Sequence, residues 1–235
     1  LNASNVLIVG GGMIGVETAG DLAYFAKAQN KNVKVTLVHS EGALIPEFTP
    51  HAAGMTKKKL ETLGVRVMLN ERAVRNKDNP KKVVLQSSGR EMTYDQVVWA
   101  TGIFPCNSFL DRKYLDGRGW IKVDEYFRVK GAENKLFALG DCCDLLPNQG
   151  VQILGTMNVI GKNIRAVLKA LEKDTMTTVE RKMRKALVSS EVYCATIGKQ
   201  TGVALTPLGH TQFMLPWVKN STMFLFNPKG QLGLK

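Results

Sequence analysis

This 235-residue sequence lacks the features that would mark a membrane-spanning, zinc-binding or dithiol redox protein. No apolar run approaches the ~20 residues that a membrane-spanning helix needs, so the sequence allows only peripheral contact with a membrane. The four cysteines have neither C-x-x-C nor Cys/His metal spacing, so we predict no metal site and no dithiol centre. A reducing intracellular compartment, mitochondrial or cytoplasmic, is the simpler explanation of free cysteines. The cysteines are Cys106, Cys142, Cys143 and Cys194.

Acidic residues are also scarce, with 20 Asp and Glu against 32 Lys and Arg and a formal net charge of +12. The densest basic cluster runs from Arg181 to Lys185 and suits an anionic lipid or a nucleic acid, although a solvated helix face is the favoured explanation. Its nearest aromatic residue for stacking on bases is Tyr193. We therefore expect only non-specific, salt-sensitive nucleic-acid binding, or contact with nucleic acid through a larger assembly.

A glycine-rich turn between a strand and a helix is the main positive signal. Val6 to Val9 reads as a buried parallel strand, and Gly10, Gly12 and Gly15 follow in the G-x-G-x-x-G spacing that opens a helix. Gly10 permits the tight turn, Gly12 leaves room for a pyrophosphate, and Gly15 lets the helix pack close to the strand. The free N–H groups at the start of this helix would bind phosphate. A purely structural glycine turn is the alternative.

The pattern after this turn predicts a compact α/β domain that ends near residue 104. A second strand completes a βαβ unit, and a helix, a third strand, a β-hairpin around a Ser-Ser-Gly turn and a return strand follow. We expect these elements at 33–38, 47–63, 65–69, 81–86 with 90–93, and 96–100.

The remainder of the chain is richer in loops. We expect short strands at 120–123 and 135–139, a helix over 152–171, a linker at 172–178 and a third region with Gly/Pro turns at 206–207, 215–216 and 227–228. The long helix carries an apolar stripe that core packing explains. The stripe comprises Leu154, Met157, Ile160, Ile164, Val167, Leu168 and Leu171.

Three sequence blocks in order carry a resemblance to a known family. They are GGGMIGVETAGDL at Gly10, VVWATGIFP at Val97 and NKLFALGDCCD at Asn134. They resemble the FAD-dependent pyridine nucleotide oxidoreductases, flavoproteins with two dinucleotide-binding domains. VTLVHSEG at Val35 and TIGKQTGVALTPLG at Thr196 resemble the branch of the apoptosis-inducing-factor-like ferroptosis suppressor and the type II NADH dehydrogenases.

The resemblance implies an α/β fold with a Rossmann-like nicotinamide domain, the C-terminal part of an FAD-binding domain and a small α+β C-terminal region. The corresponding ranges are 1–104 for the NAD(P)-binding domain, 105–170 for the returning part of the FAD-binding domain and 171–235 for the interface domain. In this family a first glycine fingerprint holds FAD upstream of the nicotinamide domain. We therefore expect that the N-terminal FAD-binding half is missing from this chain.

The resemblance also implies cofactor-binding residues. It places Gly140 and Asp141 at the FAD ribitol, Thr101 and Gly102 against the nucleotides, and Glu17 near the nicotinamide and flavin rings. Asp141 would otherwise be a helix cap or turn residue. Glu17 would otherwise be a first-turn glutamate favoured by the helix dipole.

His39 stands where NAD-specific proteins usually carry an acidic residue after the second strand. A histidine there can donate to a ribose hydroxyl or to a 2′-phosphate, so we expect the affinities for NADH and NADPH to differ by about tenfold or less. The alternative is a solvent-facing loop residue.

The sequence thus predicts an FAD-dependent NAD(P)H oxidoreductase that passes hydride to flavin and then electrons to an acceptor. A quinone is favoured as acceptor by the resemblance alone. The rival hypothesis is a non-catalytic scaffold subunit of a larger assembly, such as a ribonucleoprotein, that keeps the fold.

Overall fold

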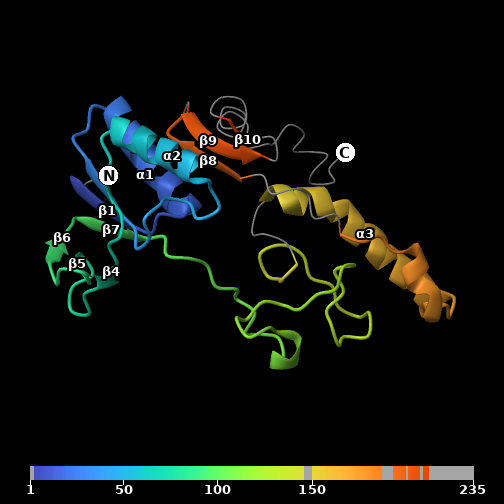
Figure 1. Cartoon of the computed structure of the whole chain (residues 1–235). Coiled ribbons are helices and arrows are strands. Elements are labelled where there is room, and N and C mark those ends of the chain that lie inside the picture. The colour runs from blue at the N-terminus through green and yellow to red at the C-terminus, as the bar shows by residue number, and fades with distance from the viewer. Residues whose placement is uncertain (1–2, 146–149, 187–192, 200, 207–208, 212–235) are drawn as a thin grey trace. The chain divides into compact units, whose positions relative to one another are not determined.

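The computed structural model describes residues 3–145, 150–186, 193–199, 201–206 and 209–211 (Figure 1). The chain divides into two compact units. Unit 1 comprises residues 1–102 and 190–235, and unit 2 comprises residues 103–189. Each unit is described by itself below.

Unit 1 is built on a parallel four-stranded sheet. Its strands are β1 (Asn5–Val9), β2 (Lys34–Val38), β3 (Arg66–Met68) and β7 (Gln96–Trp99), in the order β3-β2-β1-β7. Ile8 of β1 pairs with Leu37 of β2 and Val98 of β7. Because both neighbours run parallel to β1, the carboxyl ends of all three strands lie at one edge of the sheet.

Both faces of this sheet are covered, which explains the unbroken apolar run of β1. Ile8 packs on the side of helices α1 (Met13–Ala28) and α2 (Pro50–Thr62). Leu7 and Val9 point to the other side and pack with a small antiparallel sheet. That sheet contains β4 (Ala73–Arg75), β5 (Lys82–Leu85) and β6 (Glu91–Thr93) in sequential order.

The predicted elements of residues 1–100 are all present, and only their ends differ. The second helix begins at Pro50, three residues after its predicted start, because the Thr49 hydroxyl caps it by accepting a hydrogen bond from the Ala52 N–H at 3.3 Å. Strand β4 is an addition to the predicted elements. It has three residues and gains its place only by pairing with β5.

A second antiparallel sheet of unit 1 packs against α1. It comprises β8 (Tyr193–Ile197), β9 (Thr201–Thr206) and β10 (Gly209–Thr211). Gly20 allows the close approach, because a Cβ atom there would lie 2.9 Å from the Cα atom of Ile197. The turn predicted at 206–207 falls partly, and those at 215–216 and 227–228 entirely, outside the described residues.

Unit 2 contains one long helix, α3 (Gly150–Glu172), and the 3₁₀ helices η1 (Arg112–Tyr114) and η2 (Met176–Lys182). The strands predicted at 120–123 and 135–139 are wrong, since these segments meet partners only at isolated bridges. Ile121 bridges Cys143, and Phe137 bridges Arg128. Apolar β-prone residues predict an extended segment, but a strand forms only where a neighbour runs beside it over several residues.

The apolar stripe of α3 is only partly buried, which corrects the prediction that core packing accounts for it. Val167 is 4% exposed, whereas Met157 and Ile164 are each 38% exposed. Leu168 and Leu171 are 55% and 59% exposed. Periodicity predicts which side of a helix is apolar but not whether another element covers it.

Part of the predicted linker at 172–178 is ordered as η2, whose Val179 packs on Val167 and Ala170 of α3. The predicted domain boundary at 170–171 does not coincide with a boundary between the two units, which lie near 102 and 190. No helix among the described residues is long and apolar enough to span a membrane.

Candidate functional site

Two glycines of the loop between β1 and α1 are required by the backbone itself. Gly10 has a φ of +114°, and a Cβ atom there would lie 2.2 Å from the carbonyl oxygen of Ala100. A Cβ atom on Gly15 would lie 1.9 Å from the carbonyl oxygen of Gly10. These two glycines therefore let β1, α1 and the end of β7 approach one another.

Gly12 is different, because the fold does not require its missing side chain. Its φ of −72° and ψ of −178° suit any residue, and a Cβ atom there would have no neighbour within 4 Å. Gly12 is the N-cap of α1, which has no side-chain cap and no acidic residue in its first turn. The space beside Gly12 at the start of α1 is thus open, which fits an anion that approaches the backbone closely.

His39, at the carboxyl end of β2, is turned onto the glycine loop. Its Nδ1 accepts a hydrogen bond from the Gly11 N–H at 3.0 Å, and a Cβ atom on Gly11 would lie 2.6 Å from the imidazole Cγ. This contact contradicts the alternative of a solvent-facing side chain. Because Nδ1 accepts, we assign the proton of the neutral ring to Nε2.

The environment of His39 favours the neutral form. Burial lowers the pKa of His39 below its ordinary value, and the nearby Glu41 carboxylate opposes this by raising it. Nε2 is buried and has no hydrogen-bond partner among the described residues. A buried donor without a partner costs about 1–3 kcal/mol, so a ligand oxygen within reach would relieve that cost.

Glu17 lies beyond the first turn of α1, which corrects the alternative of a first-turn glutamate, and it links this helix to β8. One carboxylate oxygen, Oε1, accepts hydrogen bonds from the backbone N–H and the Oγ1 hydroxyl of Thr196, both at 3.0 Å. The two residues are 179 positions apart in sequence. A role of Glu17 beside the nicotinamide stays a prediction.

Thr101 and Gly102 follow the carboxyl end of β7 and are exposed. A Cβ atom on Gly10 would lie 3.3 Å from the Thr101 backbone nitrogen, so the structure brings this segment beside the glycine loop. Gly102 has a φ of +120° and open space around its Cα. The glycine loop, His39, Thr101 and Gly102 therefore lie at the carboxyl edge of one parallel sheet, where α/β proteins bind nucleotides.

Gly140 and Asp141 belong to unit 2. Gly140 is buried with a φ of +85°, and its carbonyl oxygen accepts a hydrogen bond from the Cys143 N–H at 3.1 Å. The Asp141 side chain is exposed, with no ion pair or hydrogen bond to the residues that the structure describes. The turn is therefore made by backbone groups, and the carboxylate is not used to cap it.

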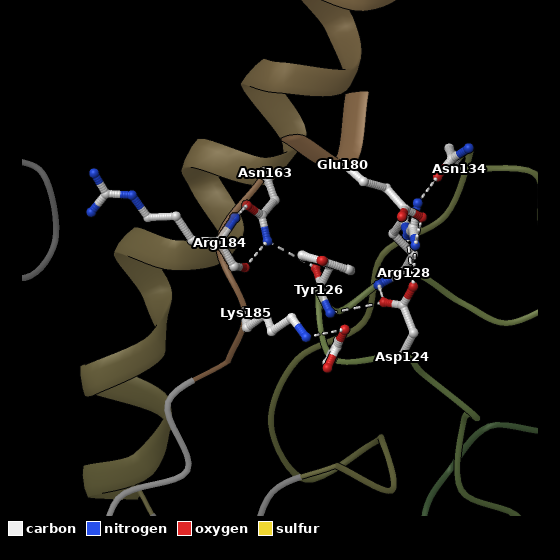
Figure 2. Close-up of polar contacts among 9 residues, drawn as sticks. Asp124, Tyr126, Arg128, Asn134, Asn163, Glu180, Arg184 and Lys185 are labelled. Atoms are coloured by element: carbon white, nitrogen blue, oxygen red, sulfur yellow. Dashed lines mark hydrogen bonds and ion pairs between the residues drawn. The ribbon is translucent and has the colours of Figure 1, made fainter. Parts of the chain in front are cut away.

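The basic cluster of residues 181–185 is partly neutralised within unit 2 (Figure 2). Lys185 forms an ion pair with Glu125 at 2.8 Å. Asn163 binds both backbone groups of Arg184, at 2.8 Å each, and the Arg184 side chain extends away from the other labelled residues. Arg181 and Lys182 end the 3₁₀ helix η2 and Arg184 and Lys185 follow it, so the four side chains are exposed but do not share one helix face as the sequence suggested.

Sequence reasoning missed two residues of the loop. Gly11 has its N–H bound by His39 and its carbonyl oxygen bound by the Ile45 N–H at 2.8 Å. Ala100 provides the carbonyl that excludes a side chain at Gly10. The unbroken run of three glycines at Gly10–Gly12 was the only sequence signal for Gly11, and Ala100 had none outside its Ala-Thr-Gly block.

The family model for pyridine nucleotide-disulphide oxidoreductases matches residues 1–173. The chain belongs to this family. The family resemblance and the α/β fold that we predicted are thereby confirmed.

Curated relatives of this oxidoreductase chain include two of the predicted branch. It is 30% identical over 193 residues to ferroptosis suppressor protein 1 of Taeniopygia guttata, covering 74% of the chain and 50% of the relative. It is 27% identical over 186 residues to the mitochondrial external alternative NAD(P)H-ubiquinone oxidoreductase B1 of Solanum tuberosum, covering 74% and 30%. The chain spans only 38% to 59% of the length of three further curated relatives that it matches.

Two solved structures share the fold. One is NDH2 of Plasmodium falciparum in complex with NADH, with a TM-score of 0.65, 16% identity, and coverage of 97% of this chain and 63% of that one. The other is an FAD-dependent pyridine nucleotide-disulphide oxidoreductase of Desulfovibrio vulgaris, with a TM-score of 0.64, 23% identity and coverage of 86% and 49%.

Proposed function

We propose that unit 1 binds NAD(P)H, with the pyrophosphate at Gly12 and the first turn of α1. This proposal rests on the open space at Gly12, at the start of a helix that has no side-chain cap. The fold itself does not require a glycine at this position. His39 is the proposed donor for the ribose nearest to β2, and its ring must turn to bring the covered Nε2–H to the ligand. Thr101 and Gly102 close the other side of the loop.

We propose further that the whole protein is an FAD-dependent NAD(P)H oxidoreductase. The flavin, when bound, accepts hydride from the nicotinamide and passes electrons on. In this chain the free carboxylate of Asp141, with the turn at Gly140, is suited to accept hydrogen bonds from the FAD ribitol. Glu17, fixed by Thr196, is the candidate for positioning the nicotinamide.

The domain assignment follows from this proposal. Residues 1–104 form the nicotinamide domain, 105–170 the returning part of the FAD-binding domain and 171–235 the interface domain. A quinone is the proposed electron acceptor and a mitochondrial location the proposed compartment, supported by the name of the potato relative. The short chain by itself should not retain FAD, because a ribitol contact cannot offset the cost of immobilising so large a ligand.

The test of nicotinamide binding is titration calorimetry of the chain with NADH and NADPH. Gly12→Val places a branched side chain where the pyrophosphate must approach, so we expect binding to be lost while thermal stability is kept. Gly54→Val is the matched control, since Gly54 lies in α2 and a Cβ atom there would have no neighbour within 4 Å. Equal NADH affinity in the parent and in Gly12→Val would overturn the proposal.

The parent titrations also measure cofactor choice. Since one neutral hydrogen bond is worth ~0.5–1.5 kcal/mol, the NADH and NADPH affinities should differ by about tenfold or less. A preference of about a thousandfold, or about 4 kcal/mol, would contradict the role proposed for His39.

A further inference from the structure

A second polar hollow of unit 1 lies at the opposite edge of the parallel sheet from the glycine loop. It is a groove of about 860 Å³, lined by the amino ends of β1, β2 and β3, the last turns of α1 and α2, and strand β6. Strand β1, with five residues, spans about 16 Å between the two edges. The groove is therefore distinct from the proposed dinucleotide site.

The groove is strongly cationic. None of its five basic side chains forms an ion pair with another residue in the described part of the chain. Its one acid, Glu91, is already bound by Lys82 at 3.3 Å and by the side-chain amide of Asn76 at 3.0 Å. The basic residues are Lys27, Lys31, Lys34, Arg66 and Arg90.

The negative carboxyl ends of two helices offset only part of this positive charge. The carboxyl ends of α1 and α2 each carry about half a negative charge, which lysines near a helix end stabilise. Five cations, one carboxylate and these two helix ends leave about three net positive charges around one hollow. Like charges so arranged repel one another, and a bound anion would relieve that repulsion.

Two buried polar residues lie beneath these charges. Thr36 and Tyr94 line the groove and are 6% and 3% exposed. Burial raises the pKa of the Tyr94 phenol, whereas a hydrogen bond with Thr36 and the charges of Arg66 and Arg90 lower it. Both guanidinium groups therefore lie close enough to influence the same buried phenol, which also lines the groove.

We propose that this groove binds a phosphate-bearing ligand of about nucleotide size. Guanidinium groups bind phosphate oxygens in a bidentate manner, and Arg66 and Arg90 belong to different elements, β3 and the loop before β6. The volume is in the range of small-molecule sites. The phosphate could come from a soluble metabolite or from a lipid headgroup.

The test is calorimetric titration of the chain with inorganic pyrophosphate at low salt, in the Gly12→Val background so that the glycine loop does not compete. We expect binding that weakens about tenfold or more in an Arg66→Gln/Arg90→Gln variant. An Arg72→Gln/Lys77→Gln variant removes the same charge from exposed residues of unit 1 outside the groove and should change affinity less than about twofold. If the glycine loop binds no pyrophosphate, the Gly12→Val background changes nothing and the groove is still tested.

Vesicle sedimentation identifies the source of the phosphate. Binding to phosphatidylcholine vesicles that contain phosphatidic acid, lost in Arg66→Gln/Arg90→Gln, would assign a lipid headgroup. Pyrophosphate binding without vesicle binding would assign a soluble ligand. Absence of both, or equal losses in the two double variants, would overturn the proposal.

Discussion

In unit 1 the strands β1 and β2 pair over five residues each, whereas in unit 2 the extended segments meet only at single bridges. The loops of unit 2 are held by scattered backbone hydrogen bonds, to which polar side chains add further bonds. Asp124 accepts hydrogen bonds from the N–H groups of Tyr126 and Arg128, and Asn163 binds the backbone of Tyr126 and Arg184 (Figure 2). Continuous strand ladders therefore link the segments of unit 1, whereas in the loops of unit 2 single polar side chains link several backbone groups at once.

The largest effect should come from Gly15→Ala in unit 1. The added Cβ would lie 1.9 Å from the Gly10 carbonyl oxygen, so β1 and α1 must separate, at a cost of at least about 3 kcal/mol. Urea unfolding measures the loss in the free energy of unfolding, and hydrogen exchange shows which elements lose protection. Gly54→Ala, at an open position of α2, should instead stabilise the protein by about 0.5–1 kcal/mol. Equal acceleration of hydrogen exchange in both units after Gly15→Ala would contradict the contrast drawn between the two units.

Asn163→Leu should be nearly as damaging, in unit 2. It leaves the carbonyl groups of Tyr126 and Arg184 and the N–H of Arg184 without their partner, which we expect to cost about 2–4 kcal/mol. Asn158→Leu is the control, because Asn158 lies exposed on the same helix. Hydrogen exchange of the amides near Tyr126 and Arg184 should accelerate only in the Asn163 variant. Equal exchange rates in the two variants would contradict a special role of Asn163 in unit 2.

Arg128→Lys should have a smaller effect on unit 2. The guanidinium binds Asp124, Asn134 and Glu180 at 2.6–2.7 Å, and a lysine cannot reproduce this planar set of bonds. We expect a loss of about 1 kcal/mol in thermal unfolding. Arg118→Lys, whose side chain is 80% exposed, should change stability by less than about 0.3 kcal/mol. Equal changes in the two variants would show that the Arg128 network contributes no stability.

The smallest effect should be a pH dependence in unit 1. Because burial lowers the pKa of His39, the unfolded chain binds a proton more readily than the folded chain. The contribution of neutral His39 is fully present above about pH 6.5 and is lost as the pH falls from there through the lower folded pKa. His39→Gln should reduce the slope of the melting temperature against pH, and His51→Gln, at an exposed residue of α2, should leave it unchanged. A slope that survives in His39→Gln would contradict this account.

Local patterns in the sequence were sufficient for most of unit 1. Four apolar residues, a fixed glycine spacing and a 3.6-residue period define β1, the turn and α1, because each signal acts within a few residues of the chain. The resemblance of three blocks added the family, which the family comparison confirmed. The same local patterns failed at 120–123 and 135–139, where strand formation depends on a neighbour.

The candidate site divides in the same way. The sequence singled out Gly10, Gly12 and Gly15, but only the structure distinguished the two that the backbone requires from Gly12, which faces open space. It also showed that His39 binds the Gly11 N–H. The cationic groove had no sequence signal, because its five basic residues come from separate segments of residues 27–90.

By itself, the sequence determined the order of elements in residues 1–100 and the place of the glycine turn, because backbone geometry and periodicity are encoded over short spans. The tertiary structure alone decided that Glu17 meets Thr196, that Asn163 holds Arg184, and that much of the apolar stripe of α3 stays exposed. These outcomes depend on which surfaces meet when distant segments pack. A contact between residues 179 positions apart leaves no periodic trace in either segment.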